Sequence, residues 1–72
     1  MKDNTLGKNI KRLRKEKGLR QKELAGELYM SGHTLCNYET GMCDPSLDTL
    51  IKLAHLLNTD PNSLLGWEES KE

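Results

Sequence analysis

The sequence predicts an all-α fold: a compact bundle of about five short helices in a single domain over residues 1–72, with a core at about 5–66 and frayed ends. Three observations predict it. Leucine, isoleucine and alanine recur at intervals of three and four residues, which places them on one face of a helix. Serine, asparagine and aspartate precede these stretches and glycines follow them, as at helix starts and ends. Aromatic residues make up only 4% of the chain, so the core must be built from small aliphatic side chains.

The first helix is expected to run to about Lys17. Its N-cap is expected to be Thr5 or the preceding residue, Asn4. Gly18 follows as the left-handed residue that commonly ends a helix, and Leu19 is expected to fill the core between the first two helices. The buried stripe is expected at i, i+4 and i+7, on Leu6, Ile10 and Leu13.

Residues 21–41 predict two short helices joined by a tight turn at residues 29–31. The apolar stripe of the first consists of Leu24, Ala25 and Leu28. Ser31 is a good N-cap for the second, at about residues 32–39, and Gly41 ends it. Two packed helices with a turn of three or four residues between them form a helix-turn-helix.

The second helix of this pair has two different faces. At about 100° per residue, only Leu35 and Tyr38 point inward. The opposite side carries His33, Cys36, Asn37 and Thr40. A protein that reads DNA needs cations for the phosphates and short polar side chains on a protruding helix for the base edges. Asn37 is the leading base-contacting candidate, because its amide can both donate to and accept from adenine. The alternative for each residue is an ordinary solvated side chain.

A fourth helix is expected from about Leu47 to Leu57, with Ser46 as its N-cap. Its stripe is the clearest in the chain and consists of Leu47, Leu50, Ile51, Ala54 and Leu57.

A short fifth helix is expected after Asp60, its N-cap, with Pro61 in the first position, where a missing amide costs nothing. Leu64 and Leu65 are expected to face the core. Trp67 is expected to close the bundle or to lie at a dimer contact.

Charge is distributed unevenly along the chain. The net charge is zero, but residues 1–22 hold nine of the eleven Lys and Arg against two acids, a net charge of +7. Residues 23–72 hold the other two against nine acids, a net charge of −7. A polyanion such as DNA meets one face of a protein rather than its average charge. A basic solvated helix followed by an acidic tail is the alternative, and charge alone does not separate the two.

No apolar run approaches the roughly 20 residues of a membrane span, and no charged-then-apolar leader opens the chain. We therefore expect a soluble, cytoplasmic protein without a membrane partner. Two cysteines, Cys36 and Cys43, do not form the dense framework of a small secreted protein.

These elements resemble the phage-repressor/Cro type helix-turn-helix family, often called the XRE family. The resemblance covers roughly residues 5–66. The matching segments are KRLRKEKGL (11–19), QKELA (21–25), Ser31, TLCNYETG (34–41) and PSLDTLIKLAHLLN (45–58). The resemblance implies a lambda-repressor-like DNA-binding domain and a sequence-specific transcriptional regulator, a repressor, that inserts its third helix into the DNA major groove. Family members usually bind palindromic operators on double-stranded DNA as homodimers.

By this resemblance, base contacts fall on Gly32, His33 and Asn37, with Cys36 used less often. Gly32 has no side chain and the third helix carries no Lys or Arg. Either a modest affinity or discrimination through DNA shape is therefore expected. The backbone amides of residues 41–44 match a phosphate-binding loop of the family. The expected phosphate-binding side chains are those of Gln21, Arg20, Lys22, Thr34, Lys11 and Arg12.

Arg14 and Glu39 match a family ion pair that ties the first helix to the end of the third, so Arg14 is expected to be structural rather than a phosphate ligand. Position 20 departs from the family, which has Ser or Thr there as a cap. Arg20 cannot accept an amide hydrogen bond, and the loss of such a cap costs about 0.5–2 kcal/mol.

Functions of other classes also fit parts of the sequence. The main alternative is a protein-interaction module of the same fold, such as an anti-repressor or accessory subunit, that does not read DNA. A zinc site built from His33, Cys36, Cys43 and His55 would lack the closely spaced ligand pairs of zinc fingers, so no metal or cofactor is expected. A Cys/His nucleophile has no evident pocket or oxyanion donors, so no enzyme activity and no small-molecule substrate are expected.

Overall fold

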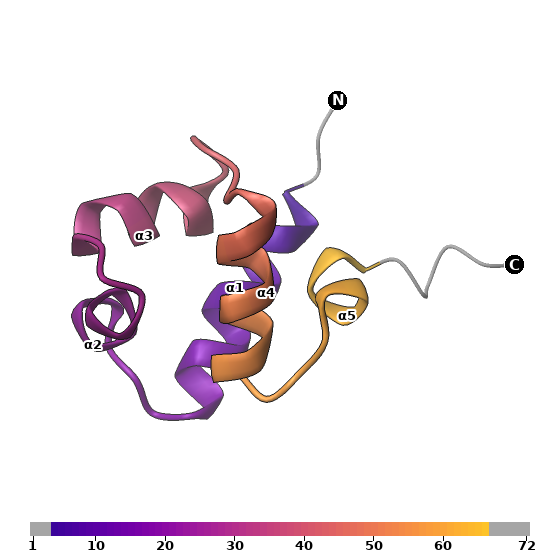
Figure 1. The fold of residues 1–72 in the computed structure, drawn as a ribbon, viewed down its shortest axis with the longest axis horizontal. Coiled ribbons are helices and arrows are strands. Elements are labelled where there is room, and N and C mark those ends of the chain that lie inside the picture. Colours follow the sequence, from indigo (N-terminus) through magenta and orange to yellow (C-terminus); the bar gives the residue numbers. More distant parts are fainter. Residues whose placement is uncertain (1–3, 67–72) are drawn as a thin grey trace, which may run out of the picture.

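Five helices make up the part of the chain that the computed structural model describes, residues 4–66 (Figure 1). They are α1 (Thr5–Glu16), α2 (Gln21–Glu27), α3 (Gly32–Thr40), α4 (Leu47–Leu56) and α5 (Pro61–Leu65). No strand occurs within residues 4–66, and the predicted all-α class is confirmed. The predicted ends of the first, third and fourth helices differ from the observed ends by one residue each.

The helix-turn-helix lies at one side of the molecule and α5 at the other, with α1 and α4 between them (Figure 1). α2 packs on α3, and α1 contacts both α3 and α5, while α4 contacts α5. α1 therefore joins the helix-turn-helix to the rest of the bundle.

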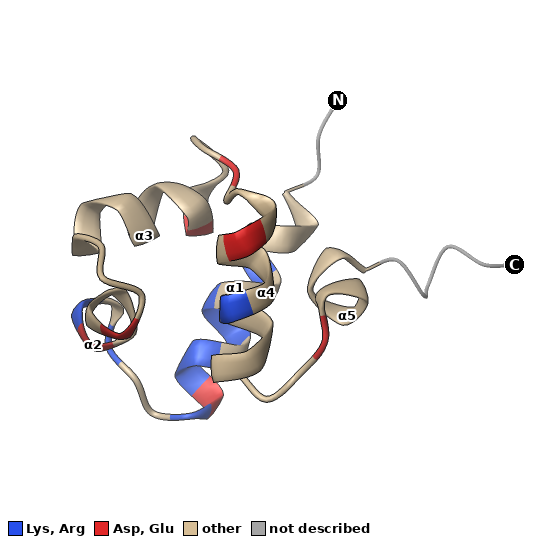
Figure 2. Ribbon diagram, in the orientation of Figure 1, with Lys and Arg blue, Asp and Glu red and all other residues tan. Residues whose placement is uncertain are grey.

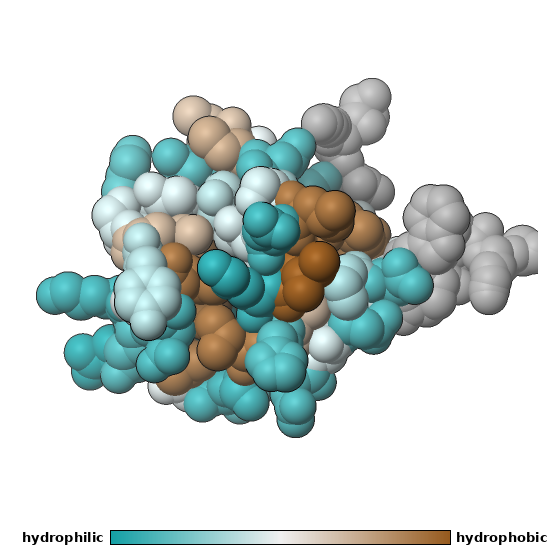
Figure 3. Space-filling view, in the orientation of Figure 1, coloured by the Kyte–Doolittle hydropathy of each residue, from teal (hydrophilic) through white to brown (hydrophobic). Residues whose placement is uncertain are grey.

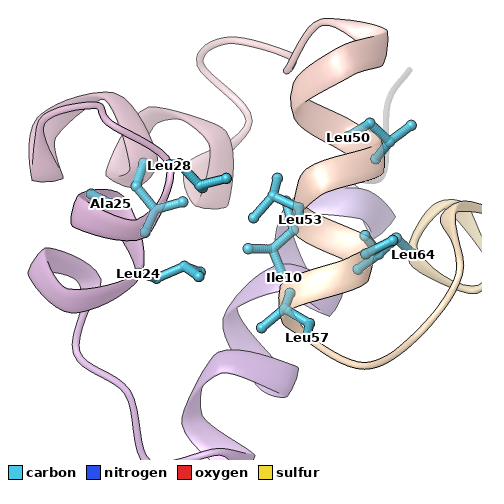
Figure 4. Close-up of a cluster of buried hydrophobic side chains, with 10 residues drawn as sticks. Ile10, Leu24, Ala25, Leu28, Leu50, Leu53, Leu57 and Leu64 are labelled. Atoms are coloured by element: carbon cyan, nitrogen blue, oxygen red, sulfur yellow. The ribbon is translucent and has the colours of Figure 1, made fainter.

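The core lies where these helices converge (Figure 4). Each helix contributes one of the five largest fully buried side chains, Ile10, Leu24, Leu35, Leu53 and Leu64. The predicted stripes of α1 and α2 are confirmed, because these residues and their neighbours in the stripes are buried or packed against the core. Leu19, in the segment between α1 and α2, also packs against the core as predicted.

The predicted stripe of α4 is wrong at two positions. Leu47 is 71% exposed and Ile51 is 50% exposed, whereas Leu53, which the prediction left out, is fully buried. The buried face consists of Leu50, Leu53, Ala54 and Leu57. This helix has more apolar residues than one face can bury, so two overlapping stripes fit the sequence and the contacts with the other helices select one. Hydrophobic side chains are consequently visible at the surface around α4 (Figure 3).

The prediction for α5 is half correct. Leu64 is fully buried, but Leu65 is 44% exposed. Adjacent residues of a helix point about 100° apart, so a helix of little more than one turn buries only one of the two. Trp67 lies outside the described residues.

Three of the predicted helix caps are confirmed. Ser31 Oγ accepts a hydrogen bond from the Thr34 amide at 3.1 Å, and Ser46 Oγ accepts one from the Thr49 amide at 3.3 Å. Asp60 Oδ2 accepts one from the amide of residue 63 at 3.4 Å. These bonds satisfy amides that have no partner inside their own helix.

Asn4 precedes α1, but its side chain does not cap that helix. Its backbone is left-handed, with φ 47°, and its Nδ2 instead donates to the carbonyl oxygen of Glu39 at 3.1 Å. Asn4 therefore ties the beginning of α1 to the end of α3. None of the helices within residues 4–66 combines the length and the apolar character needed to span a membrane.

Candidate nucleic-acid interface

The turn between α2 and α3 is tight and brings the beginnings of the two helices together. Tyr29 has a left-handed backbone (φ 57°), and the Met30 amide returns to the carbonyl oxygen of Ala25 at 3.0 Å. A Cβ placed on Gly32 would lie 4.0 Å from the Cα of Lys22. The first turn of α3 therefore lies beside the first turn of α2.

α3 divides into a buried and an outward side, as predicted. Leu35 and Glu39 are buried and Tyr38 is half-buried. The predicted outward residues are exposed or half-buried, namely His33, Cys36, Asn37 and Thr40, and Thr34 beside them is half-buried. These side chains are all polar or small, so the outward side can offer hydrogen bonds to a ligand surface.

The side-chain amide of Asn37 is free within the described part of the chain, where no hydrogen bond engages it. Its backbone carbonyl is in contrast well used: it accepts from the amides of Met42 (2.9 Å) and Cys43 (3.3 Å) and from the hydroxyl of Thr40 (3.3 Å). The backbone of residue 37 is thus held in place while its side chain remains available. An amide in this state can donate and accept together, which is what the edge of an adenine requires.

Thr34 lies in the first turn of α3, and its hydroxyl is 3.0 Å from the hydroxyl of Ser31. A hydroxyl has one donor and two acceptor positions, so this contact leaves Thr34 able to bind a further group.

The predicted ion pair between α1 and α3 is present. Arg14 Nε donates to Glu39 Oε2 at 2.7 Å, and Nη2 donates to Glu39 Oε1 at 3.2 Å. The side chains are only 7% and 2% exposed, respectively. Arg14 Nη1 also donates to the carbonyl oxygen of Leu19 at 2.7 Å. Arg14 therefore has a structural position, and its guanidinium is occupied inside the protein.

One contact of this pair was not predicted from the sequence. Gln21 Nε2 donates to Glu39 Oε1 at 2.9 Å, so the first residue of α2 is joined to the buried carboxylate. The family resemblance assigned Gln21 to phosphate and Glu39 to Arg14, and did not connect them. The signal available was that a buried carboxylate has more acceptor positions than one arginine fills.

The loop after α3 differs from the prediction. The amides of Gly41, Met42 and Cys43 all bond to carbonyl oxygens at the end of α3, those of Tyr38 and Asn37. Gly41 is left-handed, as predicted, with φ 87°. Because these bonds satisfy the carbonyls that a helix end leaves open, the three amides point into the protein rather than toward a phosphate. Of residues 41–44, only the Asp44 amide is not used in this way within the described range.

The beginning of α2 is basic and exposed. Arg20 and Lys22 are exposed, and Arg20 makes no side-chain cap, as predicted. Glu23 partly compensates, because its Oε1 accepts from the Arg20 amide at 2.8 Å. Figure 2 shows basic residues along α1 and at the beginning of α2, and none on α3.

Two predicted phosphate ligands lie on different sides of α1. Arg12 Nη2 donates to Asn9 Oδ1 at 3.4 Å and Nη1 pairs with Glu16 at 3.3 Å. Asn9 in turn donates to carbonyl oxygens of α5, so Arg12 is on the α5 side of α1. Lys11 is exposed and, at about 100° per residue, lies roughly 60° around the helix from Arg14, which reaches α3. Lys11 is therefore nearer to the helix-turn-helix side than Arg12.

Cys36 is half-buried and Cys43 is exposed, and both are free thiols. Within residues 4–66, no three His, Cys, Asp or Glu side chains gather in a way that could hold a metal ion.

Comparisons with known proteins agree with this geometry. The chain matches the sequence profile of a helix-turn-helix domain over residues 7–67. It is 43% identical over 65 residues to the HTH-type transcriptional regulator ImmR of Bacillus subtilis (strain 168), and the aligned segment covers 90% of this chain and 51% of ImmR. It is 48% identical over 59 residues to the ImmF control region 10 kDa protein of Bacillus phage phi105, and the aligned segment covers 82% of this chain and 66% of that protein. The immunity repressor protein of the same phage is 36% identical over 64 residues, or 89% of this chain and 44% of the repressor. The chain thus spans about half the length of ImmR and of the immunity repressor.

Proposed function

Because this chain belongs to the XRE-type helix-turn-helix family, we propose that it is a sequence-specific DNA-binding transcriptional regulator that acts as a repressor. α3 would enter the major groove with α2 across the DNA backbone. The names of ImmR and of the phage immunity repressor support regulation as the role, and the second supports repression.

The observation that carries the proposal is the free side-chain amide of Asn37 on the outward side of α3. His33 is exposed one turn earlier on the same helix, and Cys36 lies beside Asn37. Gly32 has no side chain, so DNA could approach the backbone of α3 closely at this position. We assign base contacts to Asn37 and His33 first, since each carries groups that can bond a base edge.

Phosphate contacts are proposed for side chains around the beginnings of α2 and α3. Gln21 and Lys22 lie in the first turn of α2, Arg20 immediately precedes it, and Thr34 lies in the first turn of α3. Lys11 lies on the side of α1 nearer to the helix-turn-helix. Each phosphate neutralised by a cation releases counterions, so Arg20, Lys22 and Lys11 should give binding its salt dependence.

Binding as a homodimer to a palindromic operator, in the cytoplasm, is proposed from the family alone. Two copies would place their α3 helices about 34 Å apart, one turn of DNA. The exposed Leu65 is a candidate dimer contact.

The experiment is fluorescence anisotropy of the purified protein with a pool of labelled duplexes, titrated across salt. We expect a log–log salt slope of several units, about −0.9 for each phosphate neutralised, and enrichment of one duplex sequence. Asn37→Ala should weaken binding to the enriched duplex by about 1–3 kcal/mol and have little effect on random DNA. Asn62→Ala, at an exposed position of α5, is the matched control. An equal effect of Asn37→Ala on both kinds of DNA would remove Asn37 as a base-reading residue.

A second candidate function is a protein-interaction module of the same fold. It is favoured by a largely apolar groove of about 320 Å³ between the end of α2 and α4, lined by Glu27, Tyr29, Ile51, Lys52, His55 and Leu56. The lack of Lys and Arg on α3 favours it as well. If the protein bound no duplex even at low salt, this function would replace DNA binding.

A further inference from the structure

Glu39 is a buried carboxylate at the meeting point of three helices. Its two oxygens accept three hydrogen bonds, two from Arg14 of α1 and one from Gln21 of α2. Its own backbone carbonyl accepts a bond from Asn4. Arg14 balances the charge of the carboxylate, and a fully bonded pair of this kind has a fixed geometry.

Gln21 is the member of this network that also reaches the surface. Its side chain is half-buried, and one N–H of its amide is held by Glu39 Oε1. An amide has two N–H donors and one oxygen acceptor in a single plane. A carboxylate only accepts, so it must face the amide nitrogen and not the amide oxygen. The bond to Glu39 therefore selects one of the two flipped orientations of the amide and fixes the direction of its second N–H.

From this geometry we propose that Glu39 is a positioning residue for the DNA-backbone contact of Gln21. Glu39, itself held by Arg14, fixes one N–H of the Gln21 amide so that the second N–H is ready to donate to a phosphate oxygen. The inference rests on the proposed function, since it names how one of its phosphate contacts is prepared. A donor that is already oriented loses less conformational freedom on binding than a free glutamine, which raises affinity.

The first test is NMR of the free protein, and it needs no DNA. Gln21 is the only glutamine in the chain, so its side-chain NH2 signals can be assigned without ambiguity among those of the asparagines. We expect two clearly separated proton shifts, with slow exchange for the proton held by Glu39. In the double variant Arg14→Met/Glu39→Met, which removes both buried charges together and should keep the fold, the two signals should move to the positions of a solvated glutamine.

The second test measures the effect of Gln21→Ala on DNA affinity in both backgrounds. With Glu39 present, loss of one oriented hydrogen bond should weaken binding about 2- to 10-fold on every duplex. In the Arg14→Met/Glu39→Met background, Gln21→Ala should change the logarithm of the dissociation constant by at most half as much. Should the double variant fail to fold, Gln21→Asn replaces it: asparagine keeps the amide but is one methylene too short to reach Glu39, so it should bind DNA as weakly as Gln21→Ala.

Three results separate the inference from the function on which it rests. A salt-dependent DNA complex in which Gln21→Ala has the same effect in both backgrounds would overturn the positioning role and leave DNA binding intact. Gln21→Asn binding as well as the unmodified protein would do the same. Absence of any DNA complex, with the NMR signature present, would overturn the proposed function and reduce the Gln21–Glu39 bond to a structural one.

Discussion

Gly7 of α1 lies directly against the carbonyl oxygen of Glu39 at the end of α3. A Cβ on Gly7 would come within 2.5 Å of that oxygen and within 2.6 Å of the carbonyl oxygen of Tyr38. Real Cβ atoms do not approach backbone oxygens so closely, so a glycine is required for these helices to pack at this distance. The contact sets how near α1 lies to the helix-turn-helix.

Gly7→Ala should therefore lower the free energy of unfolding by about 1–3 kcal/mol, because backbone must move to admit the methyl group. Gly26→Ala is the matched control, since a Cβ there meets no atom within 4 Å. It should raise the free energy of unfolding by about 0.5–1 kcal/mol through helix propensity. Urea denaturation of both variants measures the two changes in the free energy of unfolding. Equal changes would contradict the close contact between Gly7 and α3.

Replacing one partner of the Arg14–Glu39 pair should be far more harmful than replacing both. Arg14→Met leaves a carboxylate buried without its cation, which costs about 3–5 kcal/mol. That is comparable with the whole stability that a core of this size supplies, so the single variant should be largely unfolded at 25 °C. Arg14→Met/Glu39→Met should be folded, as judged by far-UV circular dichroism and a cooperative melting curve. A well-folded Arg14→Met protein would show that the pair contributes little.

Arg20→Ser should improve stability and weaken DNA binding together. Serine at this position can accept an amide bond of α2, and Glu23 already accepts the amide bond of residue 20, so both halves of a capping box would be present. We expect a gain of about 0.5–2 kcal/mol in the free energy of unfolding and a salt slope smaller by about one unit. Arg20→Gln, which removes the charge without adding a good cap, should change only the salt slope.

Asp60 gives the cap of α5 a defined pH dependence. The hydroxyl of residue 63 donates to its Oδ1 at 2.7 Å, and chiefly through this bond the pKa of Asp60 is lowered from its ordinary value. A lowered pKa means that the folded state favours the carboxylate, so the stabilisation is complete above about pH 4 and is lost as the pH falls below it. The urea concentration at the midpoint of unfolding should therefore decrease as the pH is lowered below about 4. Asp60→Asn cannot titrate, so its difference from the unmodified protein should shrink as the pH is lowered.

The helix boundaries were predictable from the sequence because local signals set them. Ser31, Ser46 and Asp60 cap their helices through bonds that span three residues, and Gly18 and Gly41 adopt the left-handed backbone that ends a helix. The outward side of α3 also followed from periodicity, since Leu35 and Tyr38 mark its inward direction. Neither kind of signal depends on the other helices.

What the sequence could not predict depends on contacts between helices. Leu53 replaces Ile51 in the core because the packing of α4 on the shared hydrophobic cluster selects the stripe. One exception is local: the amides of Met42 and Cys43 turn to the end of their own helix, α3, although the resemblance assigned them to phosphate. The bond between Gln21 and Glu39 joins residues 18 apart, and no local pattern indicates it.

The division of α3 into two sides has a consequence for how proteins of this kind change over time. Leu35 and Glu39 hold the helix in place, whereas the side chains of His33, Cys36 and Asn37 are not needed by the core. Mutations at the second group can accumulate one at a time without a folding defect at any step. With the base contacts proposed for these residues, such a scaffold can acquire new DNA targets faster than it loses its structure, and two gene copies can diverge in target by single substitutions.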